Sequence, residues 1–443
     1  MNHFIINHLW ANKVHKNLIT AIILALFFPV SQGFAQIQFE DYFINQTMRV
    51  DLVFSGDKDN TEITFREVKA EPFWGGNRRM LTDPFNYGEF MLQVRDDSTG
   101  TVIYSRGFST LYSEWQTTAE ATQMKRSFDE VVVFPFPGKK ILLELLERDT
   151  EGIFQKIYEL PVDPAGIFIN RDRMVPAAVS DIMVNGDPNE KVDIVFVAEG
   201  YTAGEMDKYL GDVRRFTDFL FSRDPFKAYR ESFNIRAVQS VSLDSGTDIP
   251  GEGIWQNTPC NSSFYTFGVD RYLTTFDYRS VCDFAGLAPR DHIFVIVNSE
   301  IYGGGGVYNH YSMGTCDHVY SEEVFIHEFG HEFAGLGDEY FDSEVAYSDF
   351  YPLNREPWEP NLTTLVSFER KWKDLLDPAT PVPTPEKSEY LNKTGVFEGG
   401  GYVTKGVYRP AVDCTMRYTA TAGNFCEVCK RSIIRMIDYH IGK

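Results

Sequence analysis

Hydrophobic and polar residues alternate along the first third of the chain, beginning shortly after residue 36. Apolar side chains take every second position over residues 48–54, which is the period of a half-buried β-strand. The same alternation occurs over residues 90–104 and 141–160, and turn-forming Asp, Thr and Gly residues interrupt each stretch, as in a β-hairpin. Short strands separated by turns predict an all-β antiparallel sandwich over residues 36–169.

The pattern changes after this region. Residues 170–191 contain Pro, Asn and Gly with little periodicity, so we interpret them as a linker. Beyond them, continuous apolar runs at residues 192–198 and 292–297 are typical of strands that are buried on both faces, and residues 204–221 have a helical pattern. Strands that alternate with helices predict an α/β domain with a mostly parallel sheet over residues 192–443.

The N-terminus has the pattern of an export signal. Two lysines precede an apolar run over residues 18–30, and small residues follow the run. The alternative is a membrane anchor, but the run is shorter than the roughly 20 apolar residues that cross a bilayer. Residues 1–35 are therefore predicted to be a signal peptide that is cleaved near Ala35/Gln36. The mature protein is expected to be exported, whether periplasmic, at the cell surface or secreted.

Charge and cysteine content limit the partners and the compartment. The chain has 63 acidic and 42 basic residues and a formal net charge of −21, which disfavours nucleic acid as a partner. No transmembrane segment is expected in the mature chain. In an exported protein six cysteines favour disulfide bonds, although their spacing does not choose a pairing. The six are Cys260, Cys282, Cys316, Cys414, Cys426 and Cys429.

The predicted sandwich contains neither Cys nor His. Chemistry is therefore expected in the second domain, and the sandwich is expected to act as a scaffold or to dock substrate. In that second domain Cys426 and Cys429 form a Cys-x-x-Cys pair, a spacing found in redox and metal sites. No second such pair is present to complete a structural zinc site.

One stretch carries the elements of a catalytic metal site. His327, Glu328 and His331 form a His-Glu-x-x-His motif within a helix that is predicted over residues 322–334. Residues four apart share one face of a helix, so the two histidines can bind one Zn²⁺. The glutamate beside them can deprotonate a water molecule at the metal. The alternative is an amphipathic helix with two surface histidines.

A catalytic zinc site usually has three protein ligands, so one more is expected. Gly335 and Gly337 can end the helix and turn the chain back towards the metal, which makes Asp338 the favoured third ligand. Glu332 lies about 100° round the helix from His331 and is poorly aimed. The remaining alternatives are Glu339, His310 and His318.

Four consecutive glycines at residues 303–306 precede the motif helix. Glycine lets another backbone approach closely, so we interpret this stretch as an edge strand that could pair with an extended peptide substrate. A flexible loop is the alternative. Substrate contacts are assigned to Gly304, Gly305, Gly306, Val307 and Tyr308. Ser321 is the expected N-cap of the motif helix.

The arrangement resembles the metzincin zinc peptidases. In that clan a His-Glu-x-x-His motif is followed by Gly and then by a third ligand three residues later, as with Gly335 and Asp338 here. This chain has one extra residue before that glycine and has Asp where His is usual. The clan also has a turn whose Met lies beneath the metal, and Met416 matches it. Tyr418 matches a tyrosine that stabilises the oxyanion in some members.

A fuller match is to the IgA-peptidase family of exported bacterial metallopeptidases, which often have a β-sandwich domain before the catalytic domain. It covers about residues 190–443. The matching stretches are residues 195–202, 303–309, 327–340, 406–410, 414–417 and 425–429. The resemblance implies zinc-dependent cleavage of peptide bonds in a protein or peptide substrate. It does not imply that this chain cleaves immunoglobulin A.

These observations predict an exported zinc metalloendopeptidase in which Glu328 activates water, Zn²⁺ and Tyr418 stabilise the oxyanion, and Met416 packs beneath the site. A secreted binding protein on an inactive zinc-peptidase fold, with the sandwich docking host protein or glycan, is the alternative. A zinc enzyme acting on non-peptide substrates is another. Asp244 and Asp248 could bind Ca²⁺, although a turn built from Asp and Gly is the favoured interpretation.

Overall fold

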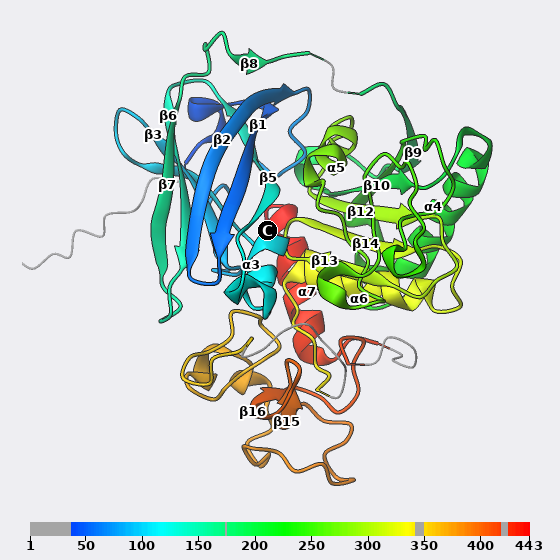
Figure 1. The fold of residues 1–443 in the computed structure, drawn as a ribbon. Helices are drawn as coiled ribbons and strands as arrows, with labels where there is room; N and C mark the ends of the chain where they lie inside the picture. Colours follow the sequence, from blue (N-terminus) through cyan, green and yellow to red (C-terminus); the bar gives the residue numbers. More distant parts are fainter. Residues whose placement is uncertain (1–36, 173–174, 342–349, 418–423) are drawn as a thin grey trace, which may run out of the picture. The chain divides into compact units, whose positions relative to one another are not determined.

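The computed structural model describes residues 37–172, 175–341, 350–417 and 424–443 (Figure 1). The predicted signal peptide and Tyr418 lie outside these ranges. Within them, no helix is both long enough and apolar enough to cross a membrane.

The N-terminal region is built from two four-stranded sheets with the strand orders β5-β1-β2-β8 and β4-β3-β6-β7. All pairings are antiparallel except that of β2 with β8. The two predicted hairpins are confirmed as the pairs β3–β4 and β6–β7. The strands are β1 (Phe43–Asp57), β2 (Asn60–Glu71), β3 (Phe90–Asp96), β4 (Val102–Phe108), β5 (Arg126–Pro137), β6 (Ile141–Arg148), β7 (Phe154–Val162) and β8 (Ile169–Asn170).

Aromatic side chains join the two sheets. Phe54 of β1 lies edge-on to Phe90 of β3, with ring centroids 5.2 Å apart, and both rings are fully buried. Tyr112 of the short helix α3 (Leu111–Gln116) packs on the same Phe54 ring. A capping box between Thr110 and Ser113 starts this helix. Another short helix, α2 (Phe39–Tyr42), precedes β1. The alternating apolar positions thus form one core between the sheets.

The C-terminal region contains a six-stranded sheet with the order β13-β14-β12-β10-β11-β9. Its four central strands run parallel, as predicted, and the two edge strands β13 and β9 are antiparallel to their neighbours. The strands are β9 (Ala178–Met183), β10 (Val192–Glu199), β11 (Phe233–Gln239), β12 (His292–Val297), β13 (Gly304–Val307) and β14 (Tyr311–Thr315). A separate hairpin is formed by β15 (Phe397–Gly400) and β16 (Val403–Arg409).

The predicted linker contains one of these strands. Residues 178–183 form β9, which pairs with β11 over five residues of register, from Gln239 to Ile235. This strand is short and mostly exposed or half-buried, so it lacks the apolar run that marks the central strands. The periodicity of the sequence did not reveal β9, because a strand at the edge of a sheet is stabilised mainly by its partner strand.

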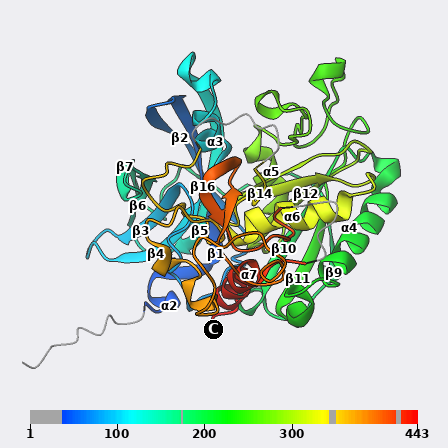
Figure 2. The same ribbon diagram turned by 90° about the horizontal axis from the view of Figure 1, so that it is seen from below.

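Four helices accompany the sheet: α4 (Met206–Leu220), α5 (Tyr278–Ala285), α6 (Ser321–Ala334) and α7 (Glu427–His440). Helix α6 packs along β12, β13 and β14, and Figure 2 shows it lying beside β12 and β14. Phe325 of α6 meets Phe294 of β12 edge-on at 4.6 Å, in a core that also contains Phe216 of α4. This aromatic core holds the helix that carries the His-Glu-x-x-His motif.

The start of α6 differs from the prediction. Its N-cap is Tyr320, and Ser321 is the first helical residue, with a buried hydroxyl that has no hydrogen-bond partner. Glu322 and Glu323 occupy the first turn, where carboxylates favour the helix dipole. The N-terminal end of α6 is therefore stabilised by these two carboxylates and not by a serine cap.

Buried ion pairs connect the two regions. Arg49 of β1, which is fully buried, lies 2.6 Å from Asp283 of α5. Arg290 donates two hydrogen bonds, of 2.7 and 3.1 Å, to the Glu71 carboxylate of β2. Residues 38–443 form one compact unit. The sandwich is thus joined to the α/β region through charged groups that are largely buried.

The six cysteines are all free, so the expectation of disulfide bonds is wrong for this structure. Three of them, Cys260, Cys282 and Cys316, are buried in the α/β region. The other three lie close together and are described below.

Candidate metal centre and active-site cleft

The motif helix ends where the sequence predicts. Gly335 takes the left-handed conformation with a φ of +61°, and its N–H donates to the carbonyl of His331. A side chain at this position would be strained, and its Cβ would meet the Trp358 ring at 2.9 Å. The chain therefore reverses directly after α6 and brings residue 338 back beneath the helix.

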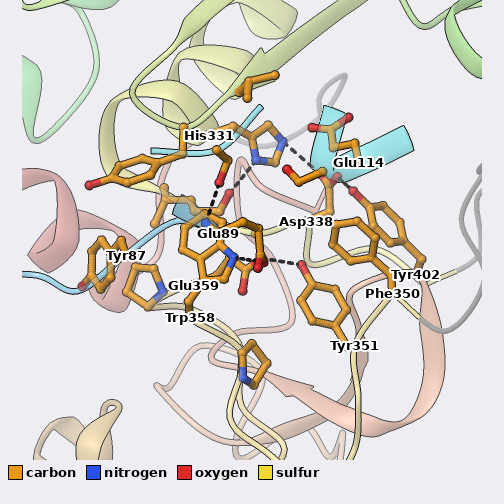
Figure 3. A pocket seen from close by; sticks show the side chains of 18 of the residues that line it. Tyr87, Glu89, Glu114, His331, Asp338, Phe350, Tyr351, Trp358, Glu359 and Tyr402 are labelled. Atoms are coloured by element: carbon orange, nitrogen blue, oxygen red, sulfur yellow. Dashed lines mark hydrogen bonds and ion pairs between the residues drawn. The ribbon is translucent and has the colours of Figure 1, made fainter. Parts of the chain in front are cut away.

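Three side-chain atoms converge below α6. The Nε2 atoms of His327 and His331 are 3.1 Å apart, and Oδ1 of Asp338 lies 3.1 Å from the first and 3.3 Å from the second. Figure 3 shows His331 and Asp338 facing one another in the cleft. A tetrahedral Zn²⁺ with bonds of about 2.0–2.1 Å separates its ligand atoms by about 3.3 Å. The spacing of these three atoms therefore fits such an ion.

The hydrogen bonds of the histidines leave their Nε2 atoms as acceptors. Nδ1 of His327 lies 2.9 Å from the carbonyl of Thr415, and Nδ1 of His331 lies 2.5 Å from that of Leu336. A carbonyl only accepts, so each Nδ1 carries the proton and each Nε2 presents a lone pair. Oδ1 of Asp338 is buried and, apart from the two histidines, has no hydrogen-bond partner in the part of the chain that the structure describes. With both rings neutral, three acceptor atoms converge on one point, which suits a cation.

Charges in the site favour the same conclusion. Burial alone would lower the pKa of His331, but the carboxylates of Asp338 and Glu328 raise it to about 9. Burial would raise the pKa of Asp338, yet the two histidines hold it well below its usual range. The carboxylates therefore stabilise positive charge at this point, which a proton on the ring or a divalent cation can supply.

The second oxygen of Asp338 is held separately. The hydroxyl of Tyr402 donates a 2.6 Å hydrogen bond to Oδ2, which orients Oδ1 towards the histidines. The two residues are 64 positions apart in the chain, and Figure 3 shows Tyr402 beside Asp338. Tyr402 had no signal in the sequence, because this contact depends on the path of the intervening chain.

Glu328 lies on α6 between the two histidines and forms part of the same group of potential metal ligands. Burial raises the pKa of its carboxyl, and the two histidine rings oppose that shift. A carboxyl whose pKa is raised towards neutrality can accept a proton and return it, as a general base requires. The general-base role of Glu328 stays a prediction, and this position beside the two histidines is where it would act.

Residues 415–417 form a turn that packs against α6. Met416 is fully buried, and its sulfur would lie 2.9 Å from a Cβ added at Gly330, between the two histidines of α6. The preceding residue, Thr415, supplies the carbonyl that orients His327. This turn therefore supports the helix from below and holds one histidine ring.

The alternative third ligands point elsewhere. Glu332 contacts Nδ1 of His292 at 2.8 Å, on the side of α6 away from the cleft. Nε2 of His310 lies 2.8 Å from Glu130 of β5, and His318 packs against Tyr320 at a distance from the cluster. Glu339 turns towards Cys429. Among these candidates, only Asp338 meets both motif histidines.

The glycine strand β13 is an edge strand, as expected, and it lines the cleft. It packs tightly on α6, since a Cβ at Gly306 would lie 2.2 Å from the backbone oxygen of Glu328. Part of its outer edge is already paired: Leu273 donates to the carbonyl of Gly304, and Ser109 to that of Tyr308. The close approach that the glycines allow is thus primarily to the motif helix.

A cleft of about 840 Å³ opens over the convergent atoms. Its floor includes His327, Glu328, His331 and Asp338. The N-terminal region forms one wall through Tyr87, Glu89 and Glu114, and Trp358 of the opposite wall donates a 2.7 Å hydrogen bond to Glu89. The sandwich therefore takes part in the site, which its lack of His and Cys did not reveal.

The acidic turn proposed for Ca²⁺ has other partners. Oδ2 of Asp244 accepts hydrogen bonds from the backbone and side-chain amides of Asn257, and Oδ1 of Asp248 accepts one from the backbone of Gln256. Gly246 between them has a φ of +98°. These contacts are those of a loop held by Asp side chains.

Comparison with known protein families identifies the family of this chain. The model for IgA Peptidase M64 matches residues 181–393 and 386–437, and the model for Peptidase M64 N-terminus matches residues 38–159. A search of curated proteins found no match. The first family model covers more than half of the chain, including every convergent residue described above. The chain therefore belongs to the IgA Peptidase M64 family of peptidases.

Proposed function

We propose that this protein is an exported, zinc-dependent endopeptidase with a metzincin-like catalytic domain. One observation carries the proposal: His327, His331 and Asp338 direct three acceptor atoms to one point, at separations of 3.1–3.3 Å, on the floor of a cleft. Membership of a metallopeptidase family supports it. Export rests on the signal-like pattern of residues 1–35.

His327, His331 and Asp338 would hold the ion. When bound, Zn²⁺ polarises the scissile carbonyl and makes a water molecule more acidic. The neutral Nε2 atoms are kept as ligands because each Nδ1–H is held by a backbone carbonyl. Tyr402 keeps the Asp338 carboxylate in one orientation.

Glu328 is assigned the proton transfers. Its carboxylate takes a proton from the attacking water and later delivers it to the leaving amine. Its raised pKa suits this exchange, since the carboxyl can hold the proton between the two steps. Tyr418 is proposed as an additional hydrogen-bond donor to the developing oxyanion.

The substrate class proposed is an unfolded or loop segment of a protein. The cleft of about 840 Å³ is open and is lined by aromatic and charged side chains, among them Tyr87, Trp358 and Arg271. Gly306 of β13 lies beside Glu328 and could meet the backbone of such a segment. We propose cleavage within a chain, as opposed to trimming of its ends, because a cleft of this volume has room for residues on both sides of the cleaved bond.

The test is the pair of variants Glu328→Gln and Glu323→Gln. Both change a glutamate of α6 to its amide, but only the first lies at the convergent atoms. Glu328→Gln should retain zinc at the wild-type stoichiometry and lose about 10²–10⁴-fold in turnover, the contribution usual for a general base. Glu323→Gln should cleave at the wild-type rate.

The measurement uses a mixed peptide library analysed by mass spectrometry, with and without a zinc chelator. Near-normal, chelator-insensitive cleavage by Glu328→Gln would reject the proposed mechanism. Specific binding of a protein without any cleavage by the wild type would instead favour the alternative of a binding protein.

A further inference from the structure

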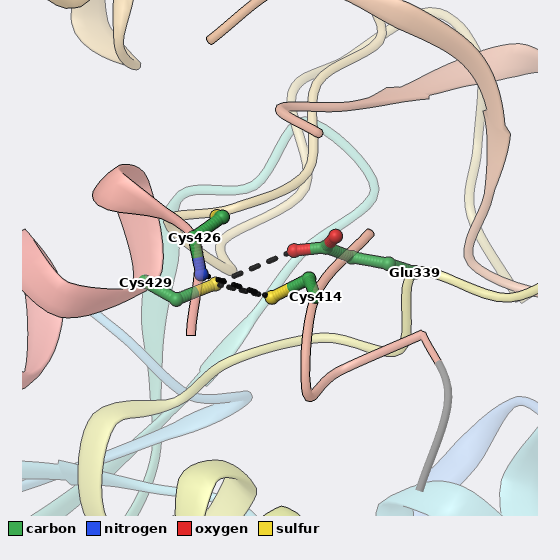
Figure 4. A group of neighbouring side chains, drawn as sticks. All are labelled: Glu339, Cys414, Cys426 and Cys429. Atoms are coloured by element: carbon green, nitrogen blue, oxygen red, sulfur yellow. Dashed lines mark hydrogen bonds between the residues drawn. The ribbon is translucent and has the colours of Figure 1, made fainter. Parts of the chain in front are cut away.

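A second group of potential metal ligands lies behind the first. Glu339, Cys414, Cys426 and Cys429 each offer one ligand atom, and these four atoms lie within 4.8 Å of one another (Figure 4). Three of the side chains are buried and Cys426 is half-buried. The four come from three segments: the chain after α6, the turn that contains Met416, and the start of α7.

The distances fit a tetrahedral metal site. The sulfurs of Cys414 and Cys429 are 3.8 Å apart, and the sulfur of Cys429 lies 3.3 Å from Oε1 of Glu339. Tetrahedral Zn²⁺ with bonds to sulfur of about 2.3 Å separates two sulfurs by about 3.8 Å, and a sulfur from a carboxylate oxygen by about 3.5 Å. The observed pairs therefore match the edges of one tetrahedron.

The start of helix α7 lies at the cluster and favours negative charge there. Cys426 is the N-cap of α7, and its backbone N–H donates to the sulfur of Cys414 at 3.3 Å. The start of a 14-residue helix stabilises nearby thiolates through its dipole. Among the described residues, the buried Oε2 of Glu339 has no hydrogen-bond partner, while Oε1, the oxygen beside Cys429, accepts from Asn361. The carboxylate therefore has one buried oxygen that a cation would satisfy.

We propose that Glu339, Cys414, Cys426 and Cys429 bind a second, structural metal ion, with Zn²⁺ as the preferred occupant. Three thiolates select zinc over calcium or magnesium, and four protein ligands leave no position for a substrate. The ion would act as a clamp on the catalytic centre, since Glu339 adjoins Asp338 and Cys414 lies two residues before Met416.

A backbone hydrogen bond already joins the same two segments. The N–H of Glu339 donates a 2.8 Å hydrogen bond to the carbonyl of Met416. A metal that joins the side chains on either side of this bond would fix Asp338 and the Met416 turn as one body. Removal of the ion should therefore loosen the catalytic site without removing any of its ligands.

A disulfide is the competing chemistry for cysteines in an exported protein. One disulfide among these three cysteines would leave the third thiol outside the bond and the Oε2 atom of Glu339 unpaired among the described residues. A metal uses all four groups at once.

The first test is metal content, measured by plasma mass spectrometry after saturation with Zn²⁺ and removal of free ion. Wild type should hold two equivalents. His331→Ala should keep one, held by the cysteine cluster, and Cys429→Ser should keep one, held by the histidines. Cys282→Ser changes a buried cysteine outside the cluster and should keep two. One equivalent in wild type, or two in Cys429→Ser, would overturn the proposal.

The second test needs no variant, so it holds even if Cys429→Ser fails to fold. Wild type produced with Co²⁺ in place of Zn²⁺ should show thiolate-to-cobalt charge-transfer absorption, which the histidine site cannot produce. After unfolding in chelator without reductant, all six cysteines should react with an alkylating reagent. Absence of the charge-transfer band, or two thiols that react only after reduction, would overturn the proposal in favour of a disulfide. Neither measurement depends on peptidase activity.

Discussion

The two oxygens of Asp338 have different tasks. Oδ1 faces the two histidines and has no donor, while Oδ2 accepts a 2.6 Å hydrogen bond from Tyr402. A carboxylate held at one oxygen cannot rotate freely, so the other is fixed where an ion would bind. Removal of a hydrogen-bond partner of this kind usually weakens metal affinity by about 10–100-fold.

The variant Tyr402→Phe removes only the hydroxyl group and therefore tests whether Tyr402 orients Asp338. The variant should bind Zn²⁺ about 10–100-fold more weakly than wild type because Asp338 loses the donor that orients it. Competition with a chelator of known affinity measures the change. Tyr351→Phe removes a hydroxyl that donates instead to Glu359 in the same cleft, and it should leave zinc affinity unchanged. Equal losses in both variants would contradict a specific role for Tyr402.

At the scale of elements, the contact between β13 and α6 decides where Glu328 lies. A Cβ at Gly304 would meet the Glu328 side chain at 2.9 Å, and one at Gly306 would meet its backbone oxygen at 2.2 Å. Backbone atoms of a helix cannot move aside as the end of a flexible side chain can. The glycines therefore set the distance between the edge strand and the catalytic helix.

Gly306→Ala should destabilise the protein by about 1–3 kcal/mol, the usual cost of overpacking a core. It should also reduce turnover, since α6 must shift away from β13. Urea unfolding and peptide cleavage measure the two effects. Gly211→Ala is the control: Gly211 is exposed in α4 with open space at its Cβ, so alanine should be neutral or stabilise by up to about 1 kcal/mol. No loss of stability in Gly306→Ala would contradict the tight packing.

At the scale of the whole molecule, buried charges unite the two regions. The Arg290–Glu71 pair is largely buried, and its members belong to different regions of the chain. Removing Arg290 leaves the buried Glu71 carboxylate with only Arg49, at 3.8 Å, as a nearby cation, which costs more than losing a surface pair. The sandwich and the α/β region are therefore expected to unfold together.

Arg290→Met should lower the free energy of unfolding by about 3–5 kcal/mol because Glu71 is left buried without its bidentate partner. Arg66→Met breaks a partly exposed pair with Asp129 within the sandwich and should cost less than about 1 kcal/mol. Denaturant unfolding followed by fluorescence measures both. Similar losses in the two variants would indicate that the buried pair does not stabilise the contact between regions.

Local patterns predicted much of the molecule. Period-two alternation identified the N-terminal hairpins, and buried apolar runs identified the parallel strands, because each signal lies within a few consecutive residues. The motif histidines and their helix were predictable for the same reason. Gly335 marked the helix end correctly because the left-handed conformation belongs to that single residue.

The sequence by itself therefore determined the N-terminal hairpins, the central parallel strands, the His-Glu-x-x-His helix and its reversal at Gly335. Tertiary structure alone decided which acid meets the histidines, that Glu339 turns to the cysteines, and that Tyr402 holds Asp338 from 64 positions away. It also decided that residues 178–183 join a sheet and that the sandwich lines the cleft. The physical reason is that periodicity reports a residue's own strand or helix, whereas these contacts join segments far apart in the chain.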